Sequence, residues 1–222
     1  KILGKEMIIR VAEASSKALD KKDVYILTDD IRIKKVVEKN NFNCLITSEK
    51  AITGTDRISE VIDELNYDVF VNVQGDEPLV NPLDISKCIE LKSNNPSFVV
   101  NGYAKISNLN DFYSNNIPKV IIDENSHLIY MSRSPIPAFK SGVAKLGELK
   151  RQVCIYGFSK DDLNFIKSNQ IKKYLENSED IEILRFIEHK KKVLMFECNS
   201  NSISVDVPED LEKVIKVFKK NK

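Results

Sequence analysis

The feature that most restricts the fold is a regular alternation of short apolar runs with helix-like segments over the first 95 residues. Runs rich in β-branched and aromatic residues predict strands at 23–28 (DVYILT), 42–47 (FNCLIT) and 67–74 (YDVFVNVQ). Apolar residues at helical spacing predict helices over 6–19, DDIRIKKVVEKNN, TDRISEVIDEL and PLDISKCIELKSN. In TDRISEVIDEL the shared apolar face consists of Ile58, Val61, Ile62 and Leu65. Strands alternating with helices at this spacing predict an α/β fold with a parallel sheet and crossover helices.

The second half of the chain has a different pattern. The segments 97–106, 119–133 and 152–159 are strand-rich with little helix between them, and DENS (123–126) predicts a hairpin turn. The loop PIPAFKSGVAKLGELK holds two of the seven prolines, and long loops inside compact domains are often functional. We therefore expect a single domain over 1–222 with a smaller strand-rich lobe at about 104–158, a candidate for subunit contact. Helices at about 160–168 and 178–189, a strand at 192–198 and a last helix from Pro208 complete the prediction.

Composition narrows the possible partners. Lys+Arg total 34 and Asp+Glu total 33, so a net charge of +1 gives no reason to expect nucleic acid or an anionic membrane. The four cysteines have neither metal-finger nor redox spacing, which favours buried, reduced thiols and a cytoplasmic protein. We find no signal peptide and no run of about 18 apolar residues that could span a membrane.

The stretch VNVQGDEP ends a predicted strand with polar and acidic side chains. Ligands of open α/β sheets bind beyond the carboxyl ends of the strands, where Gln74, Asp76 and Glu77 are expected. Gly75 allows a sharp turn or the close approach of a ligand. An acid at this position could bind Mg²⁺, which takes oxygen ligands. Alternatively, Asp76 and Glu77 could satisfy backbone amides in the turn before the next helix.

Two further segments are candidates for the same site. Asp206 in SVDVPED follows a short apolar-alternating run, and it could bind a metal or cap the last helix. The glycine-containing loop ITGTDRISE (52–60) enters a helix, so its backbone N–H groups could contact a phosphate or a base, or it could be ordinary loop chemistry. Neither GxxxxGK[ST] nor GxGxxG occurs, which argues against a P-loop enzyme and a dinucleotide dehydrogenase.

Taken together, several segments resemble a known family over essentially the whole chain. GKEMIIRVAEAS, ITGTDRISEV, VNVQGDEPLV, MSRSPIP, CIYGF and VDVPEDLEKV resemble the 3-deoxy-manno-octulosonate (Kdo) cytidylyltransferases, the CMP-Kdo synthetases, in order and spacing. The resemblance implies a Rossmann-like mixed, mainly parallel sheet of the nucleotide-diphosphosugar transferase type. It also implies a homodimer formed through the strand-rich lobe, and a reaction in lipopolysaccharide biosynthesis that joins CTP to an acidic eight-carbon keto-sugar and releases pyrophosphate.

The resemblance also assigns roles to individual residues. Asp76 and Asp206 match the catalytic acids that bind Mg²⁺. The positions that match nucleotide contacts are Gly54, Thr55, Asp56, Arg57 and Gln74. The positions that match the sugar pocket are Arg133, Gln152, Tyr156 and Glu182, with the Arg133 fork suited to the sugar carboxylate.

The sequence departs from the family pattern in two places. The family begins with a strand and a loop of the type IPARxxSxRLPGKPL that binds triphosphate, whereas KILGKEMI aligns with the segment after that loop. In the sugar pocket, Gln152 replaces a histidine and Ile183 replaces a glutamine. Paired polar changes can switch substrates, and QVCIY with EDIEILRF resembles a subgroup that handles 8-amino-3,8-dideoxy-manno-octulosonate. Glu182 or Glu179 could then face the ammonium group.

Three other functions remain as alternatives. A CMP-sialic-acid-type synthetase would keep the reaction and change the sugar, although VQGDEP favours the octulosonate branch. A metal-dependent glycosyltransferase would be expected to show an Asp-x-Asp strand end, which neither DDIRI nor GDEP supplies. The third alternative is a non-catalytic nucleotide-binding protein. Only one observation favours it: this sequence begins after the triphosphate-binding loop of the family.

Overall fold

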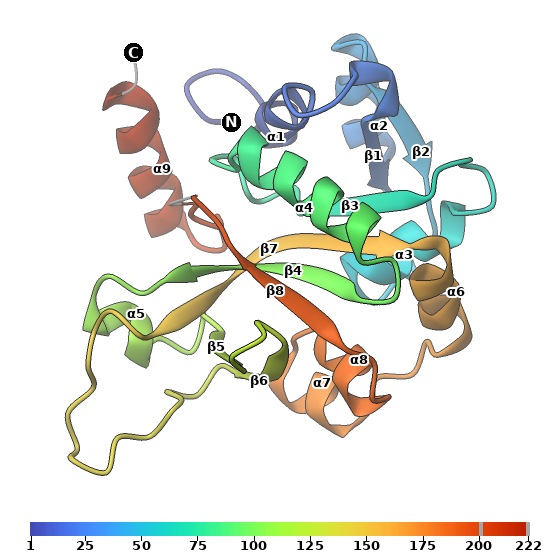
Figure 1. Ribbon diagram of the computed structural model, residues 1–222. Helices are drawn as coiled ribbons and strands as arrows, with labels where there is room; N and C mark the ends of the chain where they lie inside the picture. Colours follow the sequence, from blue (N-terminus) through green and yellow to red (C-terminus); the bar gives the residue numbers. More distant parts are fainter. Residues whose placement is uncertain (200–201, 221–222) are drawn as a thin grey trace.

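The computed structural model describes residues 1–199 and 202–220 (Figure 1). Its N-terminal half follows the predicted alternation of helices and strands. The elements are α1 (Met7–Ser15), the 3-10 helix η1 (Lys21–Asp23), β1 (Tyr25–Thr28), α2 (Ile31–Lys39), β2 (Asn43–Ile46), α3 (Gly54–Val61), β3 (Val69–Val73) and α4 (Pro82–Asn94). Helix α4 begins at Pro82, as predicted, because the Asn81 side chain accepts a hydrogen bond from the Leu83 N–H. Helix α3 ends at Val61, so Leu65 lies beyond the helix in which the pattern placed it.

The C-terminal half contains the predicted strands and hairpin. Its elements are β4 (Val99–Lys105), α5 (Leu109–Tyr113), β5 (Lys119–Ile122), β6 (Leu128–Ser132), β7 (Lys150–Ser159), α6 (Lys160–Ser168), α7 (Tyr174–Glu179), α8 (Leu184–Glu188), β8 (Val193–Glu197) and α9 (Pro208–Lys220). The sequence pattern did not predict α5, a single short helix whose N-terminus is capped by the side chain of Asn108.

The single helix predicted at 178–189 is wrong. The chain forms two short helices there, because Asp180 ends α7 with a left-handed φ of 50°. The guanidinium of Arg133 then takes the carbonyls of Glu179 and Asp180 as acceptors, at 2.6 and 3.1 Å. These carbonyls are therefore satisfied by a side chain from a distant segment and need no helical partner.

The protein has a mixed α/β fold centred on β7. Strand β7 lies between β3 and β4 and is antiparallel to both, so β3 and β4 run in the same direction. Strand β8 pairs with β4 in parallel, and the β5–β6 hairpin extends the sheet from the other part of β7. Strands β1 and β2 form a separate parallel pair.

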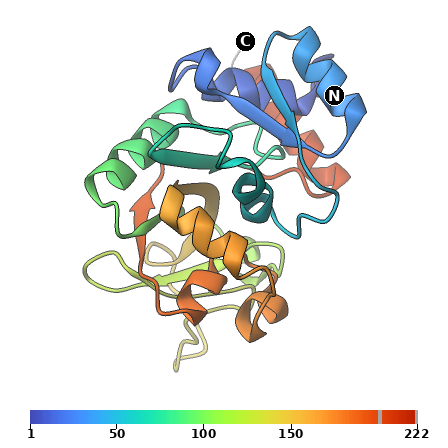
Figure 2. The same ribbon diagram turned by 90° about the vertical axis from the view of Figure 1, so that its right-hand side faces the viewer.

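A cavity of about 790 Å³ separates the β1–β2 pair from β3. In Figure 2 the blue β1–β2 pair lies above the teal β3. The lining is largely apolar and includes Ile8 and Val11 of α1, Ile26 of β1, Val71 of β3 and Ile85 of α4. Within the described residues, the two sheets are therefore joined by side chains and loops and not by a strand ladder.

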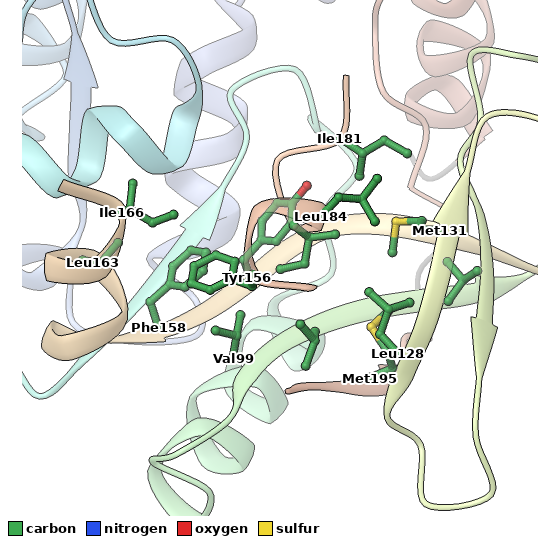
Figure 3. Close-up of a cluster of buried hydrophobic side chains, with 14 of the residues drawn as sticks. Val99, Leu128, Met131, Tyr156, Phe158, Leu163, Ile166, Ile181, Leu184 and Met195 are labelled. Atoms are coloured by element: carbon green, nitrogen blue, oxygen red, sulfur yellow. The ribbon is translucent and has the colours of Figure 1, made fainter. Parts of the chain in front are cut away.

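The two faces of β7 bury the main hydrophobic clusters. On one face Tyr156 and Phe158 stack with ring centroids 6.1 Å apart, and Phe158 stacks on Phe186 of α8 at 5.7 Å. Figure 3 shows Tyr156 and Phe158 packed near Leu163 of α6 and Leu184 of α8. The other face belongs to a second cluster with α1 and α4. Each fully buried side chain of this size contributes roughly 2 kcal/mol, so β7 is the rigid support for whatever its ends carry.

Candidate active site

A second cavity, of about 710 Å³, brings together segments that lie far apart in the sequence. It collects the turn after β3, the loop before α3, the inner face of β7, the turn before α8 and the segment before α9. The predicted site residues that line it are Gly54, Gln74, Asp76, Arg133, Gln152, Tyr156, Glu182 and Asp206. Arg57 lines the neighbouring cavity between β1 and β3, which shares Gly54, Gln74 and Asp76 with this one. Thr55 and Asp56 line neither cavity.

Asp76 and Asp206 both line this cavity and form an acidic pair. The Val205 N–H donates to the Asp76 carbonyl at 3.0 Å, which holds the segment containing Asp206 against the turn after β3. Burial raises the pKa of the Asp76 carboxyl, and the negative charge of Asp206 raises it further. The Oδ1 atom of Asp76 is buried and has no hydrogen-bond partner within the described residues.

This arrangement fits a divalent cation. A buried carboxylate oxygen without a donor is costly unless a cation or proton compensates it. No group of three or more His, Cys, Asp or Glu side chains with metal-binding geometry occurs in the part of the chain that the structure describes. Mg²⁺ needs only one or two carboxylates, because it keeps several waters. Asp76 and Asp206 are therefore the residues that could hold it.

The start of α3 approaches the cavity closely. A Cβ atom on Gly54 would lie 3.2 Å from Nδ2 of Asn72, so this position favours glycine. Thr53 caps the helix by accepting from the Asp56 N–H at 3.1 Å. The Thr55 N–H donates to Oε2 of Glu182 at 3.1 Å, and Gln74 Nε2 donates to Oε1 of the same residue at 3.3 Å. Glu182 thus joins the segments predicted to contact the nucleotide to the predicted sugar pocket.

The side chains of Asp56 and Arg57 are held by other parts of the protein. Asp56 accepts two hydrogen bonds from buried Arg185, at 2.6 and 3.0 Å, so its carboxylate lies inside the protein and away from the cavity. Arg57 donates to Thr47 Oγ1 at 2.5 Å and to the Ser48 carbonyl at 3.3 Å. It reaches Asp29 Oδ2 at 3.4 Å.

On the predicted sugar side, Gln152 and Tyr156 form one network. Gln152 Nε2 donates to Asn101 Oδ1 and to the Tyr156 hydroxyl, both at 3.1 Å. Burial is the main cause that raises the pKa of Tyr156 well above its ordinary value, so this hydroxyl is neutral and can donate. Within the described residues Gln152 Oε1 has no hydrogen-bond partner, which leaves it available as an acceptor.

The two acids considered for the sugar pocket have different surroundings. Glu179 accepts from the Ser132 hydroxyl, the Tyr130 hydroxyl and the Arg133 N–H, and the hydrogen bonds of these groups hold its pKa below the ordinary value despite partial burial. Glu182 lines the cavity directly. Of the two, Glu182 is the acid that a ligand in the cavity can reach.

Arg133 lines the cavity, but most of its donors are used. Besides the carbonyls of Glu179 and Asp180, its guanidinium donates to the carbonyls of Asn115 and Asn116 at 3.2 and 3.4 Å. These bonds leave little of the fork for a bidentate contact with a carboxylate unless the loops move.

Sequence reasoning missed several residues at this site. Arg151 and Ser202 line the cavity, and Arg185 lies buried behind it. Arg151 adjoins the singled-out Gln152 but lies in an ordinary strand pattern, and nothing in the local sequence distinguishes Ser202. Arg185 lies in the short helix α8, and no local sequence signal indicates that it bonds Asp56 of α3.

Comparison with known proteins agrees with the fold. A model of the cytidylyltransferase family matches residues 1–195. The chain is 36% identical to a 3-deoxy-manno-octulosonate cytidylyltransferase of Geotalea uraniireducens over 99% of its length and 91% of that protein. It is 38% identical to the enzyme of the same name from Leptospira interrogans serovar Lai, over all of this chain and 89% of that one.

A solved structure of a CMP:2-keto-3-deoxy-manno-octonic acid synthetase complexed with CTP superposes with a TM-score of 0.90 and 28% identity. That match covers all of this chain and 91% of the other. The fold and the cavity together define a nucleotidyltransferase. The chain belongs to the cytidylyltransferase family, and its relatives named above are 3-deoxy-manno-octulosonate cytidylyltransferases. Among the described residues, no helix combines the length and the apolar character needed to cross a membrane.

Proposed function

We propose that this protein joins CTP to an acidic eight-carbon keto-sugar, giving a CMP-sugar and pyrophosphate. The observation that carries the proposal is the Asp76–Asp206 pair, with its unpartnered buried oxygen, in one cavity with Gln152, Tyr156 and Glu182. The sugar's anomeric hydroxyl would attack the α-phosphorus of CTP, in line with the departing pyrophosphate. Such transfers depend on positioning and on charge neutralisation more than on covalent help from the protein.

The residues around the cavity have complementary tasks in this reaction. Asp76 and Asp206 would hold Mg²⁺, which when bound neutralises triphosphate charge and polarises the attacking hydroxyl. In the first turn of α3, the Thr55 and Asp56 N–H groups are bonded to Glu182 and Thr53, so the Gly54 N–H is the group that would contact a nucleotide oxygen. Glu182 fixes this turn through Thr55, so a sugar that contacts Glu182 is positioned relative to the nucleotide by the same side chain.

We further propose that the preferred sugar is 8-amino-3,8-dideoxy-manno-octulosonate and not Kdo. An ammonium group is a donor only, and the cavity offers acceptors for it at Glu182 and at the free Oε1 of Gln152. Both hydrogens of the Gln152 amide are already directed to Asn101 and Tyr156. The pocket is therefore richer in acceptors than one with an imidazole donor at position 152.

Turnover with the two sugars tests both proposals. In the presence of Mg²⁺, pyrophosphate should be released from CTP with either sugar. The kcat/KM value should be higher for the 8-amino sugar. A clear preference for Kdo would overturn the choice of substrate, and no pyrophosphate with either sugar would overturn the proposed reaction.

Asp76→Asn should abolish Mg²⁺-dependent turnover while the circular dichroism spectrum stays unchanged. Asp68→Asn, at an exposed position before β3, is the matched control and should retain activity.

We also propose that the lobe at about 104–158 forms a homodimer interface. Several large apolar side chains of this lobe are exposed, at 56% for Tyr113, 56% for Ile129, 67% for Val143 and 48% for Leu146. Large apolar side chains exposed on one lobe favour contact with another protein surface. Sedimentation equilibrium should give a dimer for the parent protein, and Ile129→Glu should shift it toward monomer. A monomeric parent at micromolar concentration would contradict this proposal.

A further inference from the structure

The segment that carries Asp206 has little support of its own. Residues 202–206 precede α9 and form neither helix nor strand. One anchor is the hydrogen bond from the Val205 N–H to the Asp76 carbonyl. Further anchors in the described part of the chain are at Ser202, a residue only 3% exposed, whose hydroxyl donates to Glu77 Oε2 and whose carbonyl accepts from Arg151 Nη2 at 3.1 Å.

Glu77 and Arg151, which contact Ser202, each lie in a well-supported part of the fold. Glu77 is 5% exposed and lies in a turn whose backbone bonds join Glu77 N–H to the Gln74 carbonyl at 3.2 Å and Val80 N–H to the Glu77 carbonyl at 3.1 Å. Arg151 lies on β7, where its backbone pairs with Ala104 of β4 on one side and with Lys119 of β5 on the other. The contacts to Ser202 therefore tie an irregular segment to the most rigid part of the fold.

The burial of Glu77 needs an explanation beyond packing. A buried carboxylate is expensive, and the cost rises with Asp76 and Asp206 nearby. A neutral side chain of the same shape could fill the space more cheaply. A carboxylate does, however, form a stronger hydrogen bond to a hydroxyl than a neutral acceptor does. Holding Ser202 firmly is thus a role that favours an acid at position 77.

We propose that Glu77 and Arg151 are positioning residues that clamp Ser202 and thereby set the separation of the Asp76 and Asp206 carboxylates. Glu77 adjoins Asp76 in the chain, and Ser202 lies four residues before Asp206, so the clamp closes a short loop through both acids. This inference rests on the proposed function, because it assumes that the two acids hold a divalent cation. Removing a group that orients a metal ligand by a hydrogen bond commonly lowers the metal affinity by about 10–100-fold.

Direct measurement of metal binding tests the clamp. Mn²⁺ binding to the whole protein is followed by electron paramagnetic resonance, and the Mg²⁺ concentration for half-maximal turnover is measured separately. Ser202→Ala removes one hydroxyl and leaves every charge in place. We expect it to weaken Mn²⁺ binding about tenfold and to raise the Mg²⁺ requirement with little change in kcat at saturating Mg²⁺. Ser202→Thr keeps the hydroxyl and should restore binding, and Arg151→Met should weaken it.

A matched control separates positioning from stability. Ser159 also donates its hydroxyl to a buried carboxylate, that of Asp162 at 2.9 Å, but at the start of α6 and outside the cavity. Ser159→Ala should lower thermal stability without changing Mn²⁺ affinity. If Ser202→Ala binds Mn²⁺ as tightly as the parent while Asp76→Asn does not bind it, the clamp is refuted and the metal site stands. If Asp76→Asn binds as the parent does, the metal site of the proposed function is refuted as well.

Discussion

At the scale of the residue, Gln152 determines which groups the predicted sugar pocket can offer. Its amide holds the Tyr156 hydroxyl and Asn101, so replacing it changes two partners together. We expect Gln152→His to shift the ratio of kcat/KM for the 8-amino sugar over Kdo about tenfold toward Kdo, because a neutral imidazole has a single N–H donor and cannot bond Asn101 and Tyr156 while also presenting an acceptor to the sugar. Competition between the two sugars for limiting CTP measures this ratio directly. An unchanged ratio would show that position 152 does not select the substrate.

His189 gives a residue-scale prediction about pH. Burial lowers its pKa, and the positive charge of Lys173 lowers it further. The ring packs edge-on against Phe165 with centroids 4.9 Å apart, and its Nε2 is buried without a partner within the described residues. The ordinary pKa of an imidazole is near 6.5, so below this pH His189 takes up a proton in the unfolded chain. In the folded protein its lowered pKa keeps the ring neutral to a lower pH, so the protein loses stability as the pH falls through this range.

The corresponding measurement compares the parent with His189→Gln. Thermal unfolding followed from pH 7.5 to pH 5 should show the parent losing more stability than the variant below about pH 6.5. Parallel pH profiles for the two proteins would contradict the assigned cause.

At the scale of the element, the helices around the cavity are joined by one buried cation. Arg185 of α8 is 1% exposed, and it donates to Asp56 of α3 and to both carboxylate oxygens of Glu176 of α7 at 2.6 Å. Replacing it with Met leaves two buried acids without their cation. We expect Arg185→Met to destabilise the protein by about 3–5 kcal/mol in urea unfolding.

An exposed ion pair supplies the control for this prediction. Lys167 of α6 bonds Asp63 at 2.8 Å, with both side chains largely in solvent. Lys167→Met should cost less than about 1 kcal/mol. If the two substitutions lowered the free energy of unfolding equally, Arg185 would not join α3, α7 and α8 as described.

The elements also show what could be predicted from sequence. The strands and the start of α4 follow from local patterns, because alternation and the Asn81–Pro82 cap are local signals. The break at Asp180 could not be predicted, since its carbonyl bonds to Arg133 of a distant segment. The residues of the cavity divide in the same way, into those marked by a local motif and those placed by contacts with distant segments. Family motifs located Asp76 and Gln152, whereas the inward turn of Asp56 depends on Arg185, and the role of Ser202 depends on Glu77.

At the scale of the whole molecule, the two sheets are expected to differ in local stability. Strand β7 is paired on both edges and buried on both faces, whereas β1 pairs only with β2 among the described strands and faces a cavity. Segments with few neighbouring hydrogen bonds open locally at lower free energy than the global unfolding. Amide hydrogens of β1 and β2 should therefore exchange with deuterium at least about tenfold faster than those of β7.

Arg57 is the link that should control this difference. It lies on α3, yet it donates to Thr47 and Ser48 after β2 and reaches Asp29 after β1, so one guanidinium holds the ends of both strands. Arg57→Met should speed exchange in β1 and β2 while exchange in β7 stays unchanged, and Lys167→Met should affect neither. Equal protection of both sheets in the parent would show that they open together.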